Sequence, residues 1–254
     1  MIVLIDFGNS YCKWVQIVDG YWQHVHSFAY DRTDQLNNCL QHLPLTEAEQ
    51  IHIVSVLGAA FDEQLSQAIN KPEAVHFHQS QTAAHGILLG YRQPASYGVD
   101  RYATLVAAHQ HFAGHKIIVD CGTAITVDVL QQDGQHLGGI ILPGVDTMCA
   151  SLAMCTSGLA HTEPSADINL FADNSADAIH SGAVLTASYG LQGVIKDIQR
   201  HLGRATLIFT GGGRHKILGF DRPGTLSRPH LVLEGLFIMA GGESAQVPTA
   251  SDDI

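Results

Sequence analysis

Two stretches of the chain share one pattern, an aliphatic run that ends in Asp-x-Gly and a hydroxyl residue. The first lies within Ile2–Ser10 and the second within Ile117–Thr126, and their aspartates are 120 − 6 = 114 residues apart, close to half of the 254 residues. Four aliphatic residues before each aspartate predict a buried strand. A strand and turn repeated at half the chain length predict two related lobes that face each other across a cleft.

The residue types in the repeat favour phosphate chemistry. Asp6 and Asp120 are expected at strand ends, where ligands of α/β proteins usually bind, and the glycine after each allows a positive φ and close approach of an anion. A carboxylate beside a triphosphate requires a cation between them, which indicates Mg²⁺ or a monovalent ion. Lys13 is a candidate point charge for phosphate oxygens. The alternative is an ordinary Asp-x-Gly turn, but two copies favour the functional interpretation.

Composition limits the class of protein. Hydrophobic residues make up 46% of the chain and charged residues 15%, which is enough for the cores of two lobes. The sequence has no apolar run of about 18 residues and no basic leader, so we expect a cytoplasmic protein without a membrane partner. The 24 acidic residues exceed the 13 basic residues by 11, which disfavours a nucleic-acid partner.

Neither cysteines nor histidines predict a metal centre. Five cysteines without a C-x-x-C pair are expected to be reduced thiols, and Cys121, inside the second turn, is interpreted as a packing residue rather than a nucleophile. Among 16 histidines, the pairs His76/His78 and His109/His111 have no carboxylate or cysteine at ligand spacing. We therefore expect scattered surface histidines.

The hydrophobic pattern divides the chain into lobes 1–114 and 115–254, with a polar tail 243–254 that is expected to be disordered. In the first lobe, after the first hairpin, we expect a strand at 21–29, a helix-compatible stretch at 31–43, a strand at 51–56, a helix at 59–70, a strand at 74–77, a loop at 88–98 and a helix from Val99 to Gly114. In the second we expect, after its hairpin, a strand at 138–142, helices at 146–153 and 176–202 separated by a loop at 157–174, and a strand at 205–209.

A glycine cluster, Gly211–Gly213, follows the last of these strands. It suits an adenine or ribose that lies directly on the backbone, and its alternative is a flexible turn. The sequence contains no G-x-x-x-x-G-K-[ST], G-x-G-x-x-G, H-E-x-x-H or G-x-S-x-G. P-loop, dinucleotide-fingerprint, zincin and hydrolase-elbow interpretations therefore lose their main support.

Taken together, these motifs resemble those of the type III pantothenate kinases, members of the actin/hexokinase/Hsp70-like superfamily. The resemblance covers nearly the whole chain and rests on Asp6–Ser10 with Lys13, Gly98–Arg101, Asp120–Thr126, Gly139–Gly144, Thr210–Gly213 and Leu231–Leu236. It implies an α/β fold of two duplicated ribonuclease H-like lobes, the actin-like ATPase fold, each with a mixed five-stranded sheet flanked by helices.

The resemblance also implies an activity, the ATP-dependent phosphorylation of pantothenate to 4′-phosphopantothenate in the first step of coenzyme A biosynthesis. It further implies a homodimer and a monovalent cation, K⁺ or NH₄⁺, bound by Asp120. ATP would be held by Asp6, Phe7, Gly8, Asn9, Ser10, Tyr11, Cys12, Lys13 and Thr123. Pantothenate would be held by Tyr91, Gly98, Val99, Asp100, Arg101 and Ser175. At Asn174-Ser175 the chain departs from the family, which usually has threonine after the asparagine.

Asp100 is the candidate general base, and its alternative is an N-cap of the helix that starts there. Arg101 is a candidate partner of the pantothenate carboxylate, and its alternative is a charge on the helix surface. Two rival functions stay open at this stage. One is a non-catalytic nucleotide-binding regulator with the same fold, and the other is a sugar or acetate kinase of the same superfamily.

Overall fold

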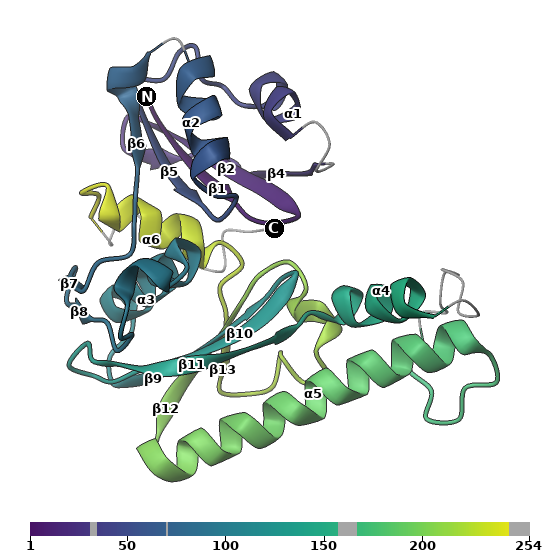
Figure 1. Cartoon of the computed structure of the whole chain (residues 1–254). Helices are drawn as coiled ribbons and strands as arrows, with labels where there is room; N and C mark the ends of the chain where they lie inside the picture. Colours follow the sequence, from purple (N-terminus) through teal and green to yellow (C-terminus); the bar gives the residue numbers. More distant parts are fainter. Residues whose placement is uncertain (31–34, 70, 157–166, 244–254) are drawn as a thin grey trace. The chain divides into compact units, whose positions relative to one another are not determined.

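The computed structural model describes residues 1–30, 35–69, 71–156 and 167–243, which form two compact units (Figure 1). Unit 1 comprises Met1–Ala113, Leu130–Gly138 and the chain from His230 onward, and unit 2 comprises Gly114–Val129 and Gly139–Pro229. Neither unit is one continuous stretch of chain, because Leu130–Gly138 and the last helix belong to unit 1, and the division into lobes 1–114 and 115–254 stays a prediction. Residues 244–254 of the expected disordered tail lie outside the described residues.

Unit 1 is built on a mixed sheet with the order β3-β2-β1-β5-β6, in which β4 also pairs with β2. Its strands are β1 (Ile2–Phe7), β2 (Tyr11–Val18), β3 (Tyr21–Trp22), β4 (His26–Ala29), β5 (Gln50–Ser55) and β6 (Val75–Phe77). β1 runs antiparallel to β2 and parallel to β5. The sheet has six strands rather than the expected five, because the segment 21–29 forms two short strands that both pair with β2.

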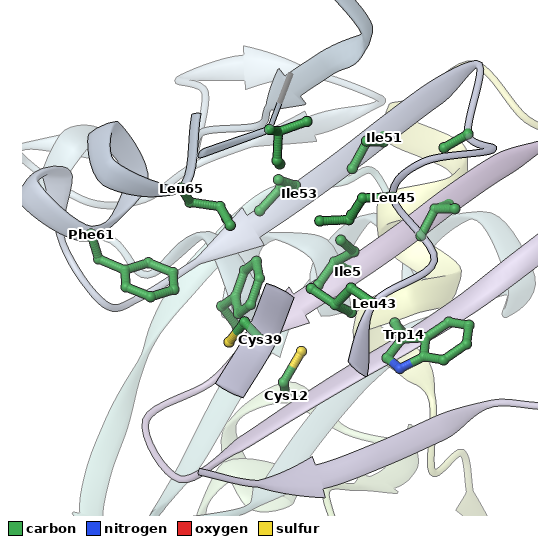
Figure 2. Packing of buried hydrophobic residues seen from close by; sticks show 14 of the residues in the cluster. Ile5, Cys12, Trp14, Cys39, Leu43, Leu45, Ile51, Ile53, Phe61 and Leu65 are labelled. Carbon is green, nitrogen blue, oxygen red and sulfur yellow. The ribbon is translucent and has the colours of Figure 1, made fainter. Parts of the chain in front are cut away.

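One face of this sheet packs against α1 (Gln35–His42) and α2 (Ala59–Ala68). Alternate residues of β1, among them Ile5, join Leu43, Phe61 and Leu65 in a buried apolar cluster (Figure 2). This alternation is the period of two that a strand with one buried face requires. Asp6, between two members of the cluster, therefore lies on the other face.

The opposite face of the sheet packs against α3 (Val99–His111) and α6 (Leu231–Met239). The motif at 231–236, for which the sequence gives no secondary-structure expectation, forms a helix. The two helices are very close, since a Cβ at Gly235 would come within 3.0 Å of the backbone of Ala103. His111 Nε2 also lies 3.5 Å from the buried Glu234 Oε2. A two-stranded antiparallel ribbon, β7 (Ala83–Ala84) and β8 (Ile87–Leu88), precedes α3.

Unit 2 contains a sheet with the order β11-β10-β9-β12-β13. Its elements are β9 (His115–Cys121), β10 (Ala124–Leu130), β11 (His136–Pro143), α4 (Val145–Cys155), α5 (Ser175–Leu202), β12 (Ala205–Thr210) and β13 (Thr225–Ser227). Side chains of α5 pack with β9, β10 and β12 in a second apolar cluster. β13 has no counterpart in the sequence expectations. No helix among the described residues is long and apolar enough to cross a membrane.

Candidate functional site

The first Asp-x-Gly turn joins β1 to β2 and is fixed by backbone hydrogen bonds. Gly8 N donates to the carbonyl of Tyr11 at 3.1 Å, and the Tyr30 hydroxyl donates to the carbonyl of Gly8. Tyr30 N donates to the carbonyl of Ser10 at 3.4 Å, and Val56 N donates to that of Phe7 at 3.1 Å. The turn is therefore held in one conformation by three neighbouring segments.

The side chains of this motif divide into two groups. Asp6 is buried and lies directly across from Lys13 in the antiparallel pair, so a carboxylate and an ammonium share one face of the hairpin. Phe7 and Cys12 point into the apolar cluster, as Figure 2 shows for Cys12, so that only their backbone atoms can face a ligand. Three other predicted ATP contacts are partly or fully exposed: Asn9, Ser10 and Tyr11.

The expectation of a positive φ after each aspartate is wrong, because neither Gly8 nor Gly122 has one. Position 8 instead has little room for a side chain, because a Cβ there would lie 3.1 Å from the carbonyl oxygen of Tyr11. At Gly122 a Cβ would make only an ordinary contact, 3.7 Å from the carbonyl oxygen of Ala124. Gly122 is exposed, so its missing side chain leaves the backbone of the turn open.

The second Asp-x-Gly turn, between β9 and β10, is packed against the glycine cluster. Thr210 pairs with Asp120 in parallel register, which places Gly211 at the end of the neighbouring strand. Gly211 has φ +84°, and a Cβ there would come within 3.0 Å of the carboxylate of Asp120 and the carbonyl of Cys121. Gly213 N donates to the carbonyl of Cys121 at 2.8 Å. Gly211 and Gly213 are thus packed against the second turn, and the choice between a nucleoside platform and a flexible turn stays a prediction.

Thr123, at the tip of the second turn, is exposed, and its backbone supports the start of α4. The carbonyl of Thr123 accepts from Gly144 N at 2.9 Å and from the Thr147 hydroxyl at 2.6 Å. A Cβ at Gly144 would come within 3.0 Å of the carbonyl oxygen of Gly122. Because Gly144, which follows Pro143 at the end of β11, has no Cβ, α4 can begin in contact with the second Asp-x-Gly turn.

Asp100 lies in the first turn of α3. The N-cap of this helix is Gly98, which makes no side-chain cap, so the interpretation of Asp100 as the N-cap is wrong. The half-buried carboxylate accepts from Arg101 N at 2.8 Å, and a Cβ at Gly98 would lie 2.5 Å from its Oδ1. Glycine at position 98 therefore leaves room for the carboxylate at the positive end of the helix.

Arg101 is 6% exposed, so it is not a charge on the helix surface. Its Nη1 donates to the hydroxyl of the partly exposed Tyr91 at 3.2 Å, and its Cζ lies 4.5 Å from the centroid of the Tyr97 ring. The structure thus brings together the substrate residues predicted in unit 1, from Tyr91 to Arg101. It also places Tyr97, which directly precedes the motif but was not predicted, against Arg101, and His136, for which the sequence offers no signal, against Tyr97.

Ser175 is the first residue of α5 and is exposed. The Asn174 side chain caps the helix by accepting from Asp177 N at 3.0 Å, which explains the asparagine before it. Ser175 belongs to unit 2, whereas Tyr91 and Arg101 belong to unit 1. Its role as a substrate contact stays a prediction.

The cysteines are free, as expected, and Cys12, Cys39 and Cys121 are buried. Burial raises the pKa of Cys121 to about 12, and Asp120 adds to this effect while Arg214 opposes it. The thiol is therefore neutral at physiological pH, which agrees with a packing residue rather than a nucleophile.

The expectation of scattered surface histidines is wrong for several residues, among them the fully buried His136 and a group around His52. His52 is buried, stacks on His76 with ring centroids 4.9 Å apart, and places Nδ1 3.0 Å from His78 Nε2. Burial is the main cause that lowers the pKa of both His52 and His78 to about 4. Within the described part of the chain, no three His, Cys, Asp or Glu side chains are arranged to hold a metal ion.

Comparison with known sequences gives consistent matches. A family model described as type III pantothenate kinase matches residues 2–198. The type III pantothenate kinase of Halorhodospira halophila is 35% identical over 248 residues, which cover 93% of this chain and 96% of that protein. The enzyme of the same name from Nitrosococcus oceani is 33% identical over 246 residues, covering 93% and 92%.

Comparison with solved structures identifies the fold. A Sinorhizobium meliloti protein assigned as a 2-dehydro-3-deoxygalactonokinase has a TM-score of 0.61 at 16% identity and covers 98% of both chains. A Campylobacter jejuni protein assigned to the Baf family of transcriptional activators has a TM-score of 0.59 at 22% identity, covering 94% and 98%. At these identities the likeness concerns the fold alone, and it confirms the expected α/β class of actin-like ATPases and sugar kinases.

Proposed function

The chain belongs to the type III pantothenate kinase family, and from this premise we propose that Asp100 is its general base and Arg101 its carboxylate-binding residue. The family reaction is the ATP-dependent phosphorylation of pantothenate to 4′-phosphopantothenate, the first step of coenzyme A biosynthesis. The observation that carries the assignment is the start of α3, where a half-buried carboxylate and a buried guanidinium occupy consecutive positions.

The proposed reaction needs few chemical groups. The 4′-hydroxyl oxygen of pantothenate attacks the γ-phosphorus of ATP, the bond to the β,γ-bridging oxygen breaks, and ADP leaves. Asp100 accepts the proton of the attacking hydroxyl. Its carboxylate accepts a hydrogen bond from the N–H of Arg101 at 2.8 Å, which holds it at the start of the helix.

Arg101 suits the other end of pantothenate, which is a carboxylate. A guanidinium presents its donors in a planar fork that matches a carboxylate, so one bound orientation is preferred. The Tyr91 hydroxyl accepts from Arg101 Nη1 and is partly exposed, so it can contact the same ligand. The reacting hydroxyl and the carboxylate would then be held by neighbouring residues of a single helix turn.

The two Asp-x-Gly turns are proposed to hold ATP and its cations. Kinases of this kind use ATP with a divalent metal, and we propose Mg²⁺ beside Asp6 and a monovalent cation, K⁺ or NH₄⁺, at Asp120. Oxygen donors from carboxylates and backbone carbonyls fit such hard cations. When bound, the divalent ion would neutralise phosphate charge. The exposed Gly212, with no atom within 4 Å of a Cβ there, leaves room for the nucleoside on the backbone of unit 2.

Replacement of the base tests the mechanism. Asp100→Asn should keep ATP binding but reduce kcat by roughly 10²-fold or more, the usual scale for a lost general base. Glu63→Gln is a matched carboxylate-to-amide control on the exposed face of α2, where Glu63 accepts from Gln67 Nε2, and it should keep wild-type turnover. Wild-type kcat in Asp100→Asn would rule out the role.

A second assay tests the substrate class. Purified protein with Mg-ATP and K⁺ would be given pantothenate, glucose or acetate, and ADP release would be followed. We expect release with pantothenate alone. Release with a sugar or acetate would favour another kinase of the superfamily, and no release with any of them would favour a non-catalytic regulator. Replacing K⁺ by Na⁺ in the active mixture should lower the rate if the monovalent site is correct, whereas NH₄⁺ should sustain it.

We also propose a homodimer, as the family resemblance implies. In unit 2, β11 is an edge strand of its sheet and exposes Ile140 by 43% and Ile141 by 61%. An edge strand with exposed apolar side chains is a typical protein-binding surface. Light scattering should give twice the chain mass of 27.3 kDa, and Ile141→Asp should give the monomer mass. A monomeric wild-type protein would refute the proposal.

A further inference from the structure

The guanidinium of Arg101 lies against two tyrosine rings of unit 1. Its Cζ is 4.5 Å from the centroid of Tyr97 and 5.7 Å from that of Tyr91. The two rings meet edge to face, with centroids 4.7 Å apart. Both distances from Cζ fall within the range of a cation–π interaction, which is stronger where water is excluded. Tyr97 is only 3% exposed, so its ring is a buried wall of the arginine site.

A third ring completes this wall. His136, fully buried at the start of β11, is stacked with Tyr91 at 6.0 Å and tilted against Tyr97 at 5.1 Å. We call Tyr91, Tyr97 and His136 the three-ring wall. Its members come from a loop, the residue before the α3 cap and a strand that starts 25 residues after α3. Tyr91 and Tyr97 contact the guanidinium, and His136 contacts the two tyrosine rings.

The backbone around the wall keeps the rings in place. Leu88 N donates to the carbonyl of Gly134 at 2.9 Å, and Gln135 Nε2 donates to the carbonyl of Leu88 at 3.3 Å. A Cβ at Gly90 would come within 3.0 Å of the carbonyl oxygen of His136. The turn between β10 and β11 is thus fastened to the loop that carries Tyr91, which is why Leu130–Gly138 belongs to unit 1.

We propose that Tyr97 and His136 are positioning residues that hold the Arg101 guanidinium in the orientation that binds the substrate carboxylate. This inference rests on the proposed function. A free arginine side chain samples many rotamers. This conformational freedom is lost when the planar fork of the guanidinium binds a carboxylate. The ring of Tyr97 lies against the guanidinium and restricts its orientation, and His136, whose ring centroid is 5.1 Å from that of Tyr97, restricts the movement of Tyr97. The wall therefore prepares the site for a carboxylate and has no role in the transfer of phosphate.

The alternative is that the rings serve only as core packing. The two roles differ in which substrate they affect. Pantothenyl alcohol has the same 4′-hydroxyl as pantothenate but carries an alcohol in place of the carboxylate. Loss of packing would reduce kcat/KM for both compounds by the same factor, whereas loss of arginine positioning would reduce it for pantothenate alone. The ratio of the two kcat/KM values is thus the informative quantity.

The experiment measures this ratio in variants of the full chain. Tyr97→Leu and His136→Leu should lower the preference for pantothenate at least tenfold through KM, with KM for ATP and kcat within about twofold of wild type. Tyr97→Phe, which keeps the ring face, should recover the preference. Tyr21→Leu, a matched change at a side chain that is 75% exposed in unit 1, should leave the preference unchanged. Arg101→Gln removes the guanidinium itself, so it should show the lowest preference for pantothenate over pantothenyl alcohol.

A second measurement applies if the leucine variants do not fold. Fluorinated phenylalanines at position 97 keep the shape of the ring while they weaken the negative charge of its face, and the logarithm of the preference should fall with each added fluorine. A constant preference across this series, or equal losses for both compounds, would overturn the inference. If Arg101→Gln keeps the preference while pantothenate is still phosphorylated, the proposed role of Arg101 fails. No turnover of pantothenate by the wild-type protein would instead show that the proposed function has failed.

Discussion

The contact between α3 and α6 predicts that an alanine at position 235 destabilises unit 1. An alanine at position 193, where nothing lies close to a Cβ, should instead stabilise its helix. A Cβ at Gly235 would meet the backbone of Ala103, which no change of side-chain rotamer can relieve. The helices must separate by roughly 1 Å, and overpacking of this kind costs about 3 kcal/mol. Alanine regains roughly 1 kcal/mol of helix propensity. Gly235→Ala should therefore lower the free energy of unfolding of unit 1 by about 2 kcal/mol.

The assay is urea unfolding followed by tryptophan fluorescence, because the only two tryptophans, Trp14 and Trp22, both lie in unit 1. Gly193→Ala is the matched control, since Gly193 is exposed within α5 and no atom lies within 4 Å of a Cβ there. By circular dichroism this variant should be stabilised by roughly 0.5–1 kcal/mol. A Gly235→Ala protein that is as stable as wild type, or more stable as the gain in helix propensity alone would make it, would refute the close packing of the helices.

Three further outcomes follow from the structure. Gly98→Ala should reduce kcat by roughly tenfold or more with little loss of stability, since its Cβ would displace the movable carboxylate of Asp100 rather than backbone, and steady-state kinetics with a melting curve would separate the two effects. For His52 and His78, whose pKa is lowered to about 4 from 6.5, the unfolded chain binds more protons than the folded chain between these values. Stability should therefore fall as pH drops from 6.5 toward 4, and a His52→Gln/His78→Gln variant should show a flatter dependence of the urea midpoint on pH. In native protein, a thiol reagent should modify the exposed Cys155 first and leave the buried Cys12, Cys39 and Cys121 protected until unfolding, so equal rates at all five cysteines, measured by mass spectrometry, would contradict the burial.

The local features of the chain could be predicted because their signals lie within a few residues. The aliphatic runs before Asp6 and Asp120 form β1 and β9, and the turns after them return into strands as expected. The bounds of α5 differ from the expected 176–202 by one residue. Its ends could be predicted because Asn174 and Gly203 are residue types that typically begin and end helices.

The features that depend on distant residues could not be predicted in this way. The pairing of α6 with α3 joins segments more than a hundred residues apart, and periodicity cannot indicate such a partner. Arg101 follows an acidic residue at the start of a helix, which is typical of a surface position, but it is buried and the rings of Tyr91 and Tyr97 lie against its guanidinium. The positive φ expected at Gly8 and Gly122 failed because short turns can also be closed by hydrogen bonds at negative φ.

The late position of α6 in the chain has a consequence for synthesis on the ribosome. The surface of α3 that α6 covers is made by residue 111, but α6 begins only at residue 231. At about 5–20 residues per second, the 231 − 111 = 120 positions from residue 112 to residue 231 take roughly 6–24 s to be synthesised. For that interval the nascent first unit presents an uncovered apolar face, which makes it a natural client for ribosome-associated chaperones and ties its maturation to completion of the polypeptide.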